Sequence, residues 1–399
     1  MKLWLKYIIF CLCGFSMIVA QDQEALKAKA HSLAQQFIIV DTHIDVPYRL
    51  QERWEDISQR TESGEFDYVR ATQGGLNAPF MSIYVPSERE NAGAQVLADS
   101  LIDMVEGFVQ KWPDKFAIAK SADAVEKQFL QRKIALGLGM ENGSPVEGKL
   151  SNLKHFFDRG IRYITLTHGK DNHICDSSYD TTRTWKGLSP FGKQVVVEMN
   201  RLGIMVDVSH ISDEAFFQVL EISKSPVIAS HSSCRAFTPR WQRNISDEMI
   251  KLVAKNGGVV MVNFGRSFLN GEFQSKEVKI WEYFAANKLK GNEPKAVEFA
   301  KKFWAENPPP SITAADVANH IDHIVKLVGP NHAGFGSDFD GVGGSLPSNL
   351  KDVSQYPNLI YELLKMGYSE RDIEKFCGGN LLRAWRHVED RAKRLQREE

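Results

Sequence analysis

Cysteine is scarce in this chain of 399 residues. Of its 5 cysteines, Cys11 and Cys13 lie near the N-terminus, whereas Cys175, Cys234 and Cys377 are far apart in the sequence. Three cysteines at such wide spacing exclude a disulfide framework. Neither sign of charge predominates, because 49 Lys and Arg nearly balance 50 Asp and Glu, and lysine-rich runs are lacking. The sequence therefore gives no indication of a nucleic-acid partner or of binding to an anionic membrane.

Long apolar stretches are also lacking after the first twenty residues. Lys2 and Lys6 precede an apolar stretch, residues 7–20, which is followed at once by polar residues. This pattern predicts a secretory signal peptide over residues 1–20, because about 14 apolar residues fall short of the roughly 20 that a spanning helix needs. We therefore expect a mature chain that is secreted or periplasmic and has no transmembrane span.

Eight short apolar runs, separated by segments with helix start and stop signals, organise the rest of the chain. The runs are residues 37–40, 79–85, 134–140, 161–167, 204–209, 226–230, 257–264 and 333–337. Alternation of strand and helix predicts a parallel sheet, and strands buried on both faces read as continuous apolar runs. Eight such units favour an α/β fold, a closed (β/α)8 TIM-type barrel formed by a single domain over residues 21–399.

An open doubly wound sheet is the alternative fold. Such a sheet usually has a glycine-rich phosphate loop after its first strand. Here the first run leads into Asp41-Thr42-His43-Ile44-Asp45 instead, which favours the barrel. Residues 267–310, after the seventh strand, are predicted to form a helical insertion. It either shapes access to the barrel mouth or is decoration without function.

Six of the runs end in a charged residue or a histidine, and barrel enzymes place their chemistry at the C-terminal ends of strands. His43 and Asp45 are two residues apart and so share one face of a strand. Alone, each such residue could be a core histidine or half of a salt bridge. Together they offer the imidazole and carboxylate ligands that zinc prefers. The predicted ligands are His43, Asp45, Glu141, His210 and His231.

Five ligands are too many for one catalytic zinc, which has three protein ligands and an open position. They suit two Zn²⁺ ions that share one carboxylate. We expect Glu141 to bridge, with His43 and Asp45 on one ion and His210 and His231 on the other. A hydroxide held between the ions would attack the scissile carbonyl.

Two further strand-end residues are candidates for catalysis and substrate binding. Asp338 is placed to take a proton from the attacking water and to pass it to a leaving amine. Gly334 and Gly336 share its face and are expected to leave open space beneath it. His168 is assigned to substrate or oxyanion binding, with helix capping as its alternative. His320 and His323 look like a ligand pair on one helix but lack partners.

Six motifs in the order and spacing of these strands resemble the membrane (renal-type) dipeptidases, which are zinc dipeptidases of the metal-dependent hydrolase barrel class. The motifs are residues 41–45, 139–143, 166–168, 207–210, 230–233 and 336–341, and the resemblance covers about residues 35–385. Asn142 departs from the pattern, since it stands where the family often has a glycine.

The resemblance implies that the five predicted ligands hold two zinc ions, and that His168 and Asp338 handle substrate and proton. It also implies an arginine that binds the C-terminal carboxylate of a dipeptide. That arginine precedes an Asn-hydrophobe-polar-Asp stretch, which places it at Arg243, with Arg235 as the alternative. Members are usually dimeric, so a homodimer is expected, and they often accept a D-residue at the second position.

The sequence thus predicts a secreted di-zinc dipeptidase. The nearest alternative is a metal-dependent hydrolase of a related amide, lactone or β-lactam bond in the same barrel class. A non-catalytic binding protein is a third hypothesis. It is disfavoured because a decaying enzyme normally loses its ligands first, and all five are present.

Overall fold

Eight parallel strands close into a barrel in the computed structural model, which describes residues 22–398. The predicted signal peptide, residues 1–20, lies outside the described residues. The strands are β1 (Ile39–Ile44), β2 (Leu76–Tyr84), β4 (Ile134–Glu141), β5 (Ile161–Thr165), β6 (Met205–Asp207), β7 (Val227–Ala229), β8 (Val259–Val262) and β9 (Ala333–Phe335). Pairing of β1 with β9 and of β2 with β4 completes the ring. The predicted (β/α)8 barrel is confirmed.

A short strand that the sequence did not reveal lies beside the barrel. β3 (Phe116–Ile118) pairs only with β4, between α4 (Ala94–Lys111) and α5 (Ala122–Leu130). Because β2 pairs directly with β4, β3 takes no place in the ring. Three residues are too few to give a readable period-two or continuous apolar pattern.

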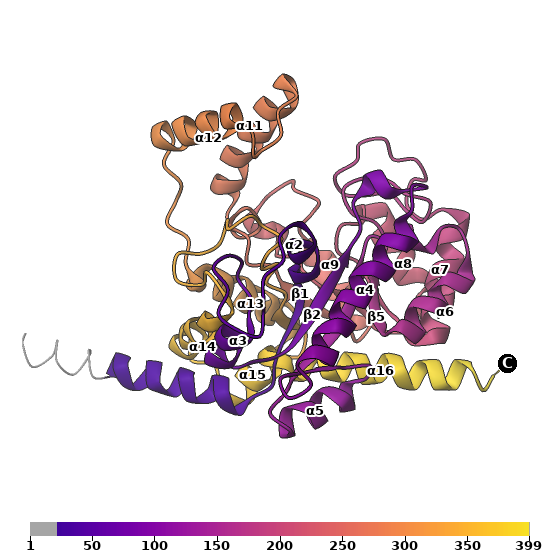
Figure 1. Cartoon of the computed structure of the whole chain (residues 1–399), viewed down its shortest axis with the longest axis horizontal. Helices are drawn as coiled ribbons and strands as arrows, with labels where there is room; N and C mark the ends of the chain where they lie inside the picture. The colour runs from indigo at the N-terminus through magenta and orange to yellow at the C-terminus, as the bar shows by residue number, and fades with distance from the viewer. Residues whose placement is uncertain (1–21, 399) are drawn as a thin grey trace, which may run out of the picture.

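Helices surround the barrel (Figure 1), and several of them begin at a side-chain cap. Ser212 and Ser246 accept hydrogen bonds from the first turns of their helices, and Thr313 and Asp316 form a capping box. The helices are α2 (Val46–Glu52), α3 (Tyr68–Gly74), α6 (Leu150–Arg159), α7 (Pro190–Leu202), α8 (Asp213–Ile222), α9 (Asp247–Lys255), α13 (Ala314–Val328), α14 (Tyr356–Lys365), α15 (Glu370–Glu374) and α16 (Asn380–Leu395).

The interior of the barrel is filled from its base. Phe80, Tyr163 and Met261 point inward from three strands and pack in one buried cluster with Trp385 of α16. The ring of Phe80 lies 5.4 Å from that of Trp385, and α16 runs across the lower side of the molecule in Figure 1. The base is therefore closed by packing, and the carboxyl ends of the strands form the open mouth.

The predicted insertion after the seventh barrel strand forms helices. α10 (Arg266–Leu269) leads into α11 (Gly271–Asn287) and α12 (Pro294–Glu306), which pair and project from the body of the molecule (Figure 1). The rings of Tyr283 and Phe299 stack 3.5 Å apart between the two helices. Among the described residues, no helix combines the length and the hydrophobicity needed to cross a bilayer.

Candidate metal centre and active site

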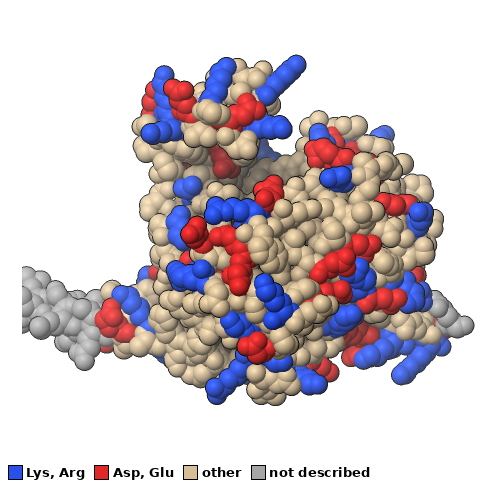
Figure 2. Space-filling view, in the orientation of Figure 1, with Lys and Arg blue, Asp and Glu red and all other residues tan. Residues whose placement is uncertain are grey.

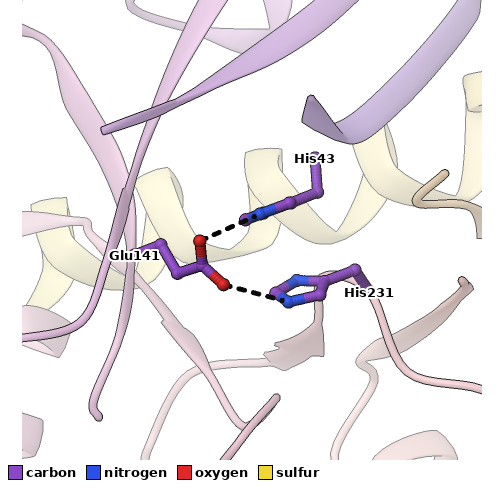
Figure 3. A group of neighbouring side chains, drawn as sticks. All are labelled: His43, Glu141 and His231. Atoms are coloured by element: carbon purple, nitrogen blue, oxygen red, sulfur yellow. Dashed lines mark ion pairs between the residues drawn. The ribbon is translucent and has the colours of Figure 1, made fainter. Parts of the chain in front are cut away.

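The five predicted ligands converge at the mouth of the barrel, with Glu141 at their centre. Glu141 is the last residue of β4, and one of its oxygens, Oε2, lies 3.3 Å from Nε2 of His43. Its other oxygen, Oε1, lies 3.1 Å from Nε2 of His210 and 3.3 Å from Nε2 of His231. Figure 3 shows the carboxylate between His43 and His231. Asp45 Oδ2 lies 3.5 Å from Nε2 of His43. One carboxylate thus faces two groups of ligands.

Hydrogen bonds behind His43 fix which of its ring nitrogens faces the centre. The hydroxyl of Tyr163 donates to the carbonyl of Thr42 at 2.9 Å and lies 2.8 Å from Nδ1 of His43. Because that hydroxyl already donates its proton, Nδ1 of His43 is the donor in their contact. In the neutral ring that can bind a metal ion, the lone pair of His43 is therefore on Nε2, which is buried and has no hydrogen-bond partner within the described residues.

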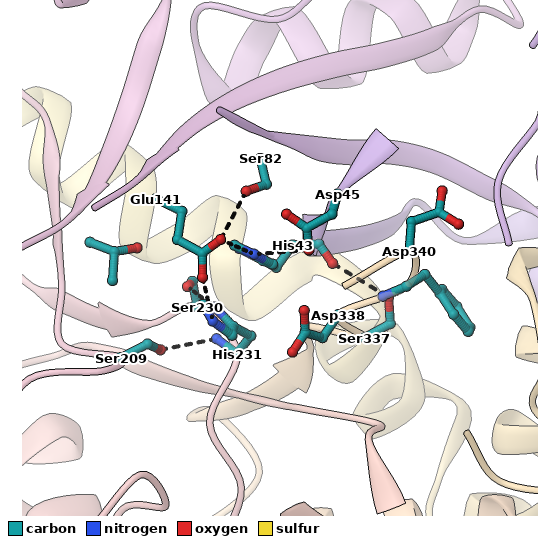
Figure 4. Close-up of polar contacts among 12 residues, drawn as sticks. His43, Asp45, Ser82, Glu141, Ser209, Ser230, His231, Ser337, Asp338 and Asp340 are labelled. Carbon is teal, nitrogen blue, oxygen red and sulfur yellow. Dashed lines mark hydrogen bonds and ion pairs between the residues drawn. The ribbon is translucent and has the colours of Figure 1, made fainter. Parts of the chain in front are cut away.

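His231 is oriented by a second chain of hydrogen bonds. Nδ1 of His231 lies 2.7 Å from Oγ of Ser230, and that hydroxyl donates to Oδ2 of Asp207 at 2.5 Å. Asp207 also accepts from the hydroxyl of Thr165. Nδ1 of His231 therefore carries the proton, and Nε2 presents its lone pair to Glu141. Figure 4 shows His231 beside Ser230 and Glu141.

The electrostatics of this cluster fit a divalent cation. Burial holds the pKa of His210 and of His231 well below its usual value, which keeps both imidazoles neutral. Burial alone would raise the pKa of Glu141, but the surrounding histidines hold it well below the usual range. A buried carboxylate that faces imidazole lone pairs repels them unless a cation lies between. Three overlapping groups of side chains could hold such an ion, because the ligand atoms within each group lie within 4.8 Å of one another: His43, Glu141 and His231; Glu141, His168 and His210; and His43, Asp45 and Asp338.

Two site residues and one neighbour adopt left-handed backbone conformations. His210 has φ 69° and Asp338 has φ 64°, values that are uncommon for residues other than glycine. Such strain is typical of functional sites. Asn142 has φ 79°, and its side chain donates to the carbonyl of Val85 at 2.8 Å. It therefore takes the conformation that a glycine would take there, and asparagine tolerates it better than most residues.

Asp338 lies at the rim of the cluster of predicted ligands, and it could hold a metal ion together with His43 and Asp45. Its Oδ2 accepts a hydrogen bond from Nδ2 of Asn263 at 2.7 Å. Burial raises the pKa of Asp338 to about 7, and bound cations would lower it again.

The expectation of open space beneath Asp338 was wrong. A side chain at Gly334 would meet Met261, and one at Gly336 would meet the carbonyl oxygen of Ser230 at 2.0 Å. The two glycines allow close packing of β9 against its neighbours rather than a void.

His168 also faces the centre. Its Nε2 lies 3.5 Å from Oε1 of Glu141, its side chain is 26% exposed, and its ring meets that of Tyr84 edge to face. Burial lowers the pKa of His168, which favours the neutral ring. His168 and Asp338 both line the large cavity described below, so both are open to a ligand.

Three residues near the centre were missed by sequence reasoning. Ser82 of β2 donates to Oε2 of Glu141 at 3.3 Å, Asn263 follows β8 and donates to Asp338, and Tyr163 orients His43. Ser82 and Asn263 come from the two apolar runs that had shown no functional residue. A polar residue inside an otherwise continuous apolar run was the available signal.

The structure distinguishes the two candidate arginines. Both terminal nitrogens of Arg235 bind Asp213, at 2.7 and 2.6 Å. Arg243 is 2% exposed and donates to Ser232 Oγ at 2.7 Å and to His210 Nε2 at 2.9 Å, while its Nε has no partner within the described residues. Arg243 thus lies beside the cluster of predicted ligands. It is behind His210 and does not line the large cavity that is described below.

The mouth of the barrel opens into one large cavity of about 970 Å³. Glu141, His168, His210 and Asp338 line its inner end. A concave cavity of this size, with convergent polar groups and shifted pKa values, is typical of a small-molecule site. The ligand set and the cavity together indicate a metal-dependent hydrolase.

Comparison with known proteins gives the family. Residues 27–399 match the family model described as membrane dipeptidase, peptidase family M19. The chain belongs to the membrane dipeptidase family. It is a metallo-dipeptidase, a hydrolase that acts on dipeptides. The family confirms what the six motifs indicated.

Relatives of this dipeptidase span nearly its whole length. It is 33% identical over 373 residues to dipeptidase 3 of Mus musculus, covering 91% of this chain and 67% of that protein. The crystal structure of the probable dipeptidase PvdM from Pseudomonas aeruginosa matches with a TM-score of 0.81 and 29% identity, covering 92% of this chain and 99% of that one. A metallopeptidase of Rhodobacter sphaeroides, liganded with a phosphinate mimic of L-Ala-D-Ala, shares the fold with a TM-score of 0.72 at 23% identity, covering 88% and 99%.

Proposed function

We propose that this dipeptidase is a secreted enzyme that uses two zinc ions to hydrolyse dipeptides. The observation that carries the proposal is the position of Glu141, one of whose oxygens faces the imidazole of His43 while the other faces the imidazoles of His210 and His231. Asp45 and His43 would hold one ion, His210 and His231 the other, and Glu141 would bind both. Bound zinc would polarise the scissile carbonyl and lower the pKa of a water molecule.

Two side chains beside the proposed metal centre would transfer the proton and stabilise the oxyanion. Asp338, held by Asn263, would accept a proton from the attacking water and deliver it to the leaving amine. His168 would donate a hydrogen bond to the developing oxyanion, because it faces both Glu141 and the cavity.

Arg243 would bind the free carboxylate of the substrate and so restrict the enzyme to dipeptides. Its planar fork can pair both carboxylate oxygens. In the structure its Nη2 donates to His210, so binding substrate requires exchange of that contact for the carboxylate. Arg235 is unsuited because Asp213 occupies both of its terminal nitrogens.

Secretion and stereochemistry complete the proposal. The leader pattern at residues 1–20 supports export to the periplasm or the exterior. The Rhodobacter sphaeroides relative holds a mimic of L-Ala-D-Ala, which supports acceptance of a D-residue at the second position by this chain.

The test is a dipeptide panel with L- and D-residues at the second position, with zinc and with a chelator. We expect hydrolysis with zinc, loss with the chelator and recovery when zinc is restored. Metal analysis of the purified protein should give two zinc ions per chain. Full activity of Glu141→Ala would refute the assignment of the centre, and hydrolysis of lactones or β-lactams alone would favour the alternative hydrolase.

A further inference from the structure

Helix α11 has a second side-chain stripe besides the one that it buries. Phe273, Ile280 and Phe284 are buried in the insertion. Gln274, Val278, Trp281 and Ala285 follow the spacing of another helical face and line the large cavity instead. Trp281 is 56% exposed and Val278 is 38% exposed. Exposed apolar side chains that line a cavity are typical of a surface that binds a ligand.

This stripe and the metal ligands belong to one continuous space. The cavity of about 970 Å³ is lined by Glu141 and His210 at one end and by Trp281 and Ala285 at the other. Figure 2 shows the hollow between the projecting α11–α12 pair and the rest of the molecule. Its volume is near the upper end of the roughly 300–1,000 Å³ of pockets that enclose drug-sized ligands. A dipeptide of two small residues leaves much of it unfilled.

Apolar side chains from the loops of the barrel also line this cavity. Trp241 and Phe268, whose rings lie 4.9 Å apart, line it together with Val342. They face the same space as Val278 and Trp281. Aromatic and aliphatic surfaces that line a cavity favour an apolar occupant, because burial of apolar area provides most of the binding energy there.

Two charged side chains of the outer part, Glu277 and Arg266, are engaged within the protein. Glu277 is hydrogen-bonded to Ser267, and burial raises its pKa. Arg266 lies over the ring of Phe273 at 4.4 Å and donates to Oγ of Ser345 at 3.3 Å. Glu282 of α11 also lines the cavity and is exposed, so the charge that remains on this side is a carboxylate, which disfavours an anionic ligand.

We propose that Trp241, Phe268, Val278 and Trp281 form an outer subsite for a bulky apolar side chain of the substrate. The preferred substrates are then dipeptides with one aromatic or large aliphatic residue, and α11 determines that preference. This inference rests on the proposed dipeptide hydrolysis at the metal centre. The insertion then helps to select the substrate, which agrees with the sequence-based hypothesis that it shapes access to the barrel mouth and not with the hypothesis that it has no function.

The experiment measures kcat/KM of the full chain with zinc for two series of dipeptides, X-Gly and Gly-X, where X is Ala, Leu, Phe or Trp. In the wild-type protein we expect kcat/KM to rise with the size of X in one series. Replacement of both Val278 and Trp281 by Ala should lower the Phe-to-Ala ratio of kcat/KM by about tenfold, while hydrolysis of the Ala substrates changes by less than about twofold.

Two variants serve as controls. Trp281→Phe keeps an aromatic ring and should retain most of the preference. Val297→Ala removes an exposed valine of α12, 52% exposed, that does not line the cavity, and should leave the ratio unchanged. Thermal unfolding of each variant establishes that it folds.

The outcomes separate the two proposals. Equal kcat/KM for Ala and Phe substrates in both series, or an equal loss for all substrates in the double variant, would overturn the outer subsite while dipeptidase activity stands. Absence of hydrolysis in every series would instead overturn the proposed function, and the subsite with it.

Discussion

The hydroxyl of Tyr163 lies 2.8 Å from Nδ1 of His43 and links that proposed ligand to the interior of the barrel. The phenol ring reaches this point by passing over Gly139 of β4, where a Cβ atom would lie 1.9 Å from the ring. Any larger residue at position 139 would clash with the ring of Tyr163, so a glycine is required there. Partners of this kind fix the tautomer and orientation of a metal-ligating histidine.

Removal of that hydroxyl should weaken metal binding without altering the packing of the core. For Tyr163→Phe we expect zinc affinity to fall by roughly 10- to 100-fold, as for other partners of ligating histidines. Competition with a chromophoric chelator measures this. Tyr283→Phe, which alters a tyrosine of the insertion stacked on Phe299, is the matched control. An unchanged zinc affinity for Tyr163→Phe would show that the contact does not orient His43.

Removal of metal should destabilise the folded protein as well as inactivate it. The Glu141 carboxylate and the lone pairs of His43 and His231 face one another, so a cation relieves their repulsion. Zinc at a thousandfold excess over its Kd would stabilise the folded state by about 4 kcal/mol. Unfolding temperature measured with chelator and with added zinc checks this. Glu141→Gln should show a much smaller zinc-dependent rise, and an equal rise in both proteins would contradict the central place of Glu141.

Loss of Arg243 should remove discrimination in favour of a free carboxylate. Hydrogen bonds to charged groups contribute about 1.5–3 kcal/mol. Arg243→Ala should therefore lower kcat/KM for dipeptides by roughly 10- to 100-fold, with little effect on the corresponding C-terminal amides. Arg235→Ala, which breaks the pair with Asp213, should lower stability and leave the selectivity intact. Loss of selectivity in the Arg235 variant alone would reverse the assignment.

A carboxyl pair beside the active site should make stability depend on pH. The backbone N–H of Glu65 donates to Oδ1 of Asp340 at 2.6 Å, and the N–H of Asp340 donates to Glu65 in return. Burial, together with the Asp340 carboxylate, raises the pKa of Glu65 to about 8. Between its ordinary value and about pH 8 the folded state holds a proton that the unfolded state lacks. The resulting stability is present at low pH and is lost as pH rises through 8.

Glu65→Gln imitates the protonated side chain and should flatten this dependence. Urea unfolding from about pH 5 to about pH 9 compares it with the wild-type protein. Glu62→Gln is the control, because Glu62 is exposed and pairs only weakly, at 3.4 Å, with Arg53. Parallel stability curves for Glu65→Gln and the wild-type protein would contradict the assignment.

The barrel could be predicted from sequence because its strands are buried on both faces. Runs such as residues 134–140 are continuously apolar and end in a functional residue, so both the element and the position of Glu141 were readable. β3 was not readable, because it has three residues and one neighbouring strand. The convergence of the proposed ligands was predictable, since each lies at or just after the end of a strand and all these strand ends meet at one mouth.

Residues that act through other residues were not predictable in the same way. Tyr163 is one aromatic residue within an apolar strand, and only the closed barrel brings its hydroxyl to His43 from β5. Asn263 meets Asp338 from 75 residues away in the sequence. The choice between Arg243 and Arg235 depended on Asp213, which neither motif contains. Such contacts are set by three-dimensional closure, so the sequence can mark a polar residue such as Asn263 within an apolar run but cannot show its partner.

The projecting pair of α11 and α12 forms part of the cavity wall but contributes no proposed metal ligand. The predicted ligands all belong to other loops and strands, whereas the far wall of the cavity is built by residues 274–285. Exchange of that hairpin for another would change which molecules are admitted and leave the reactive centre as it is. The preference for one side chain over another would then depend in part on a segment that contributes none of the proposed ligands.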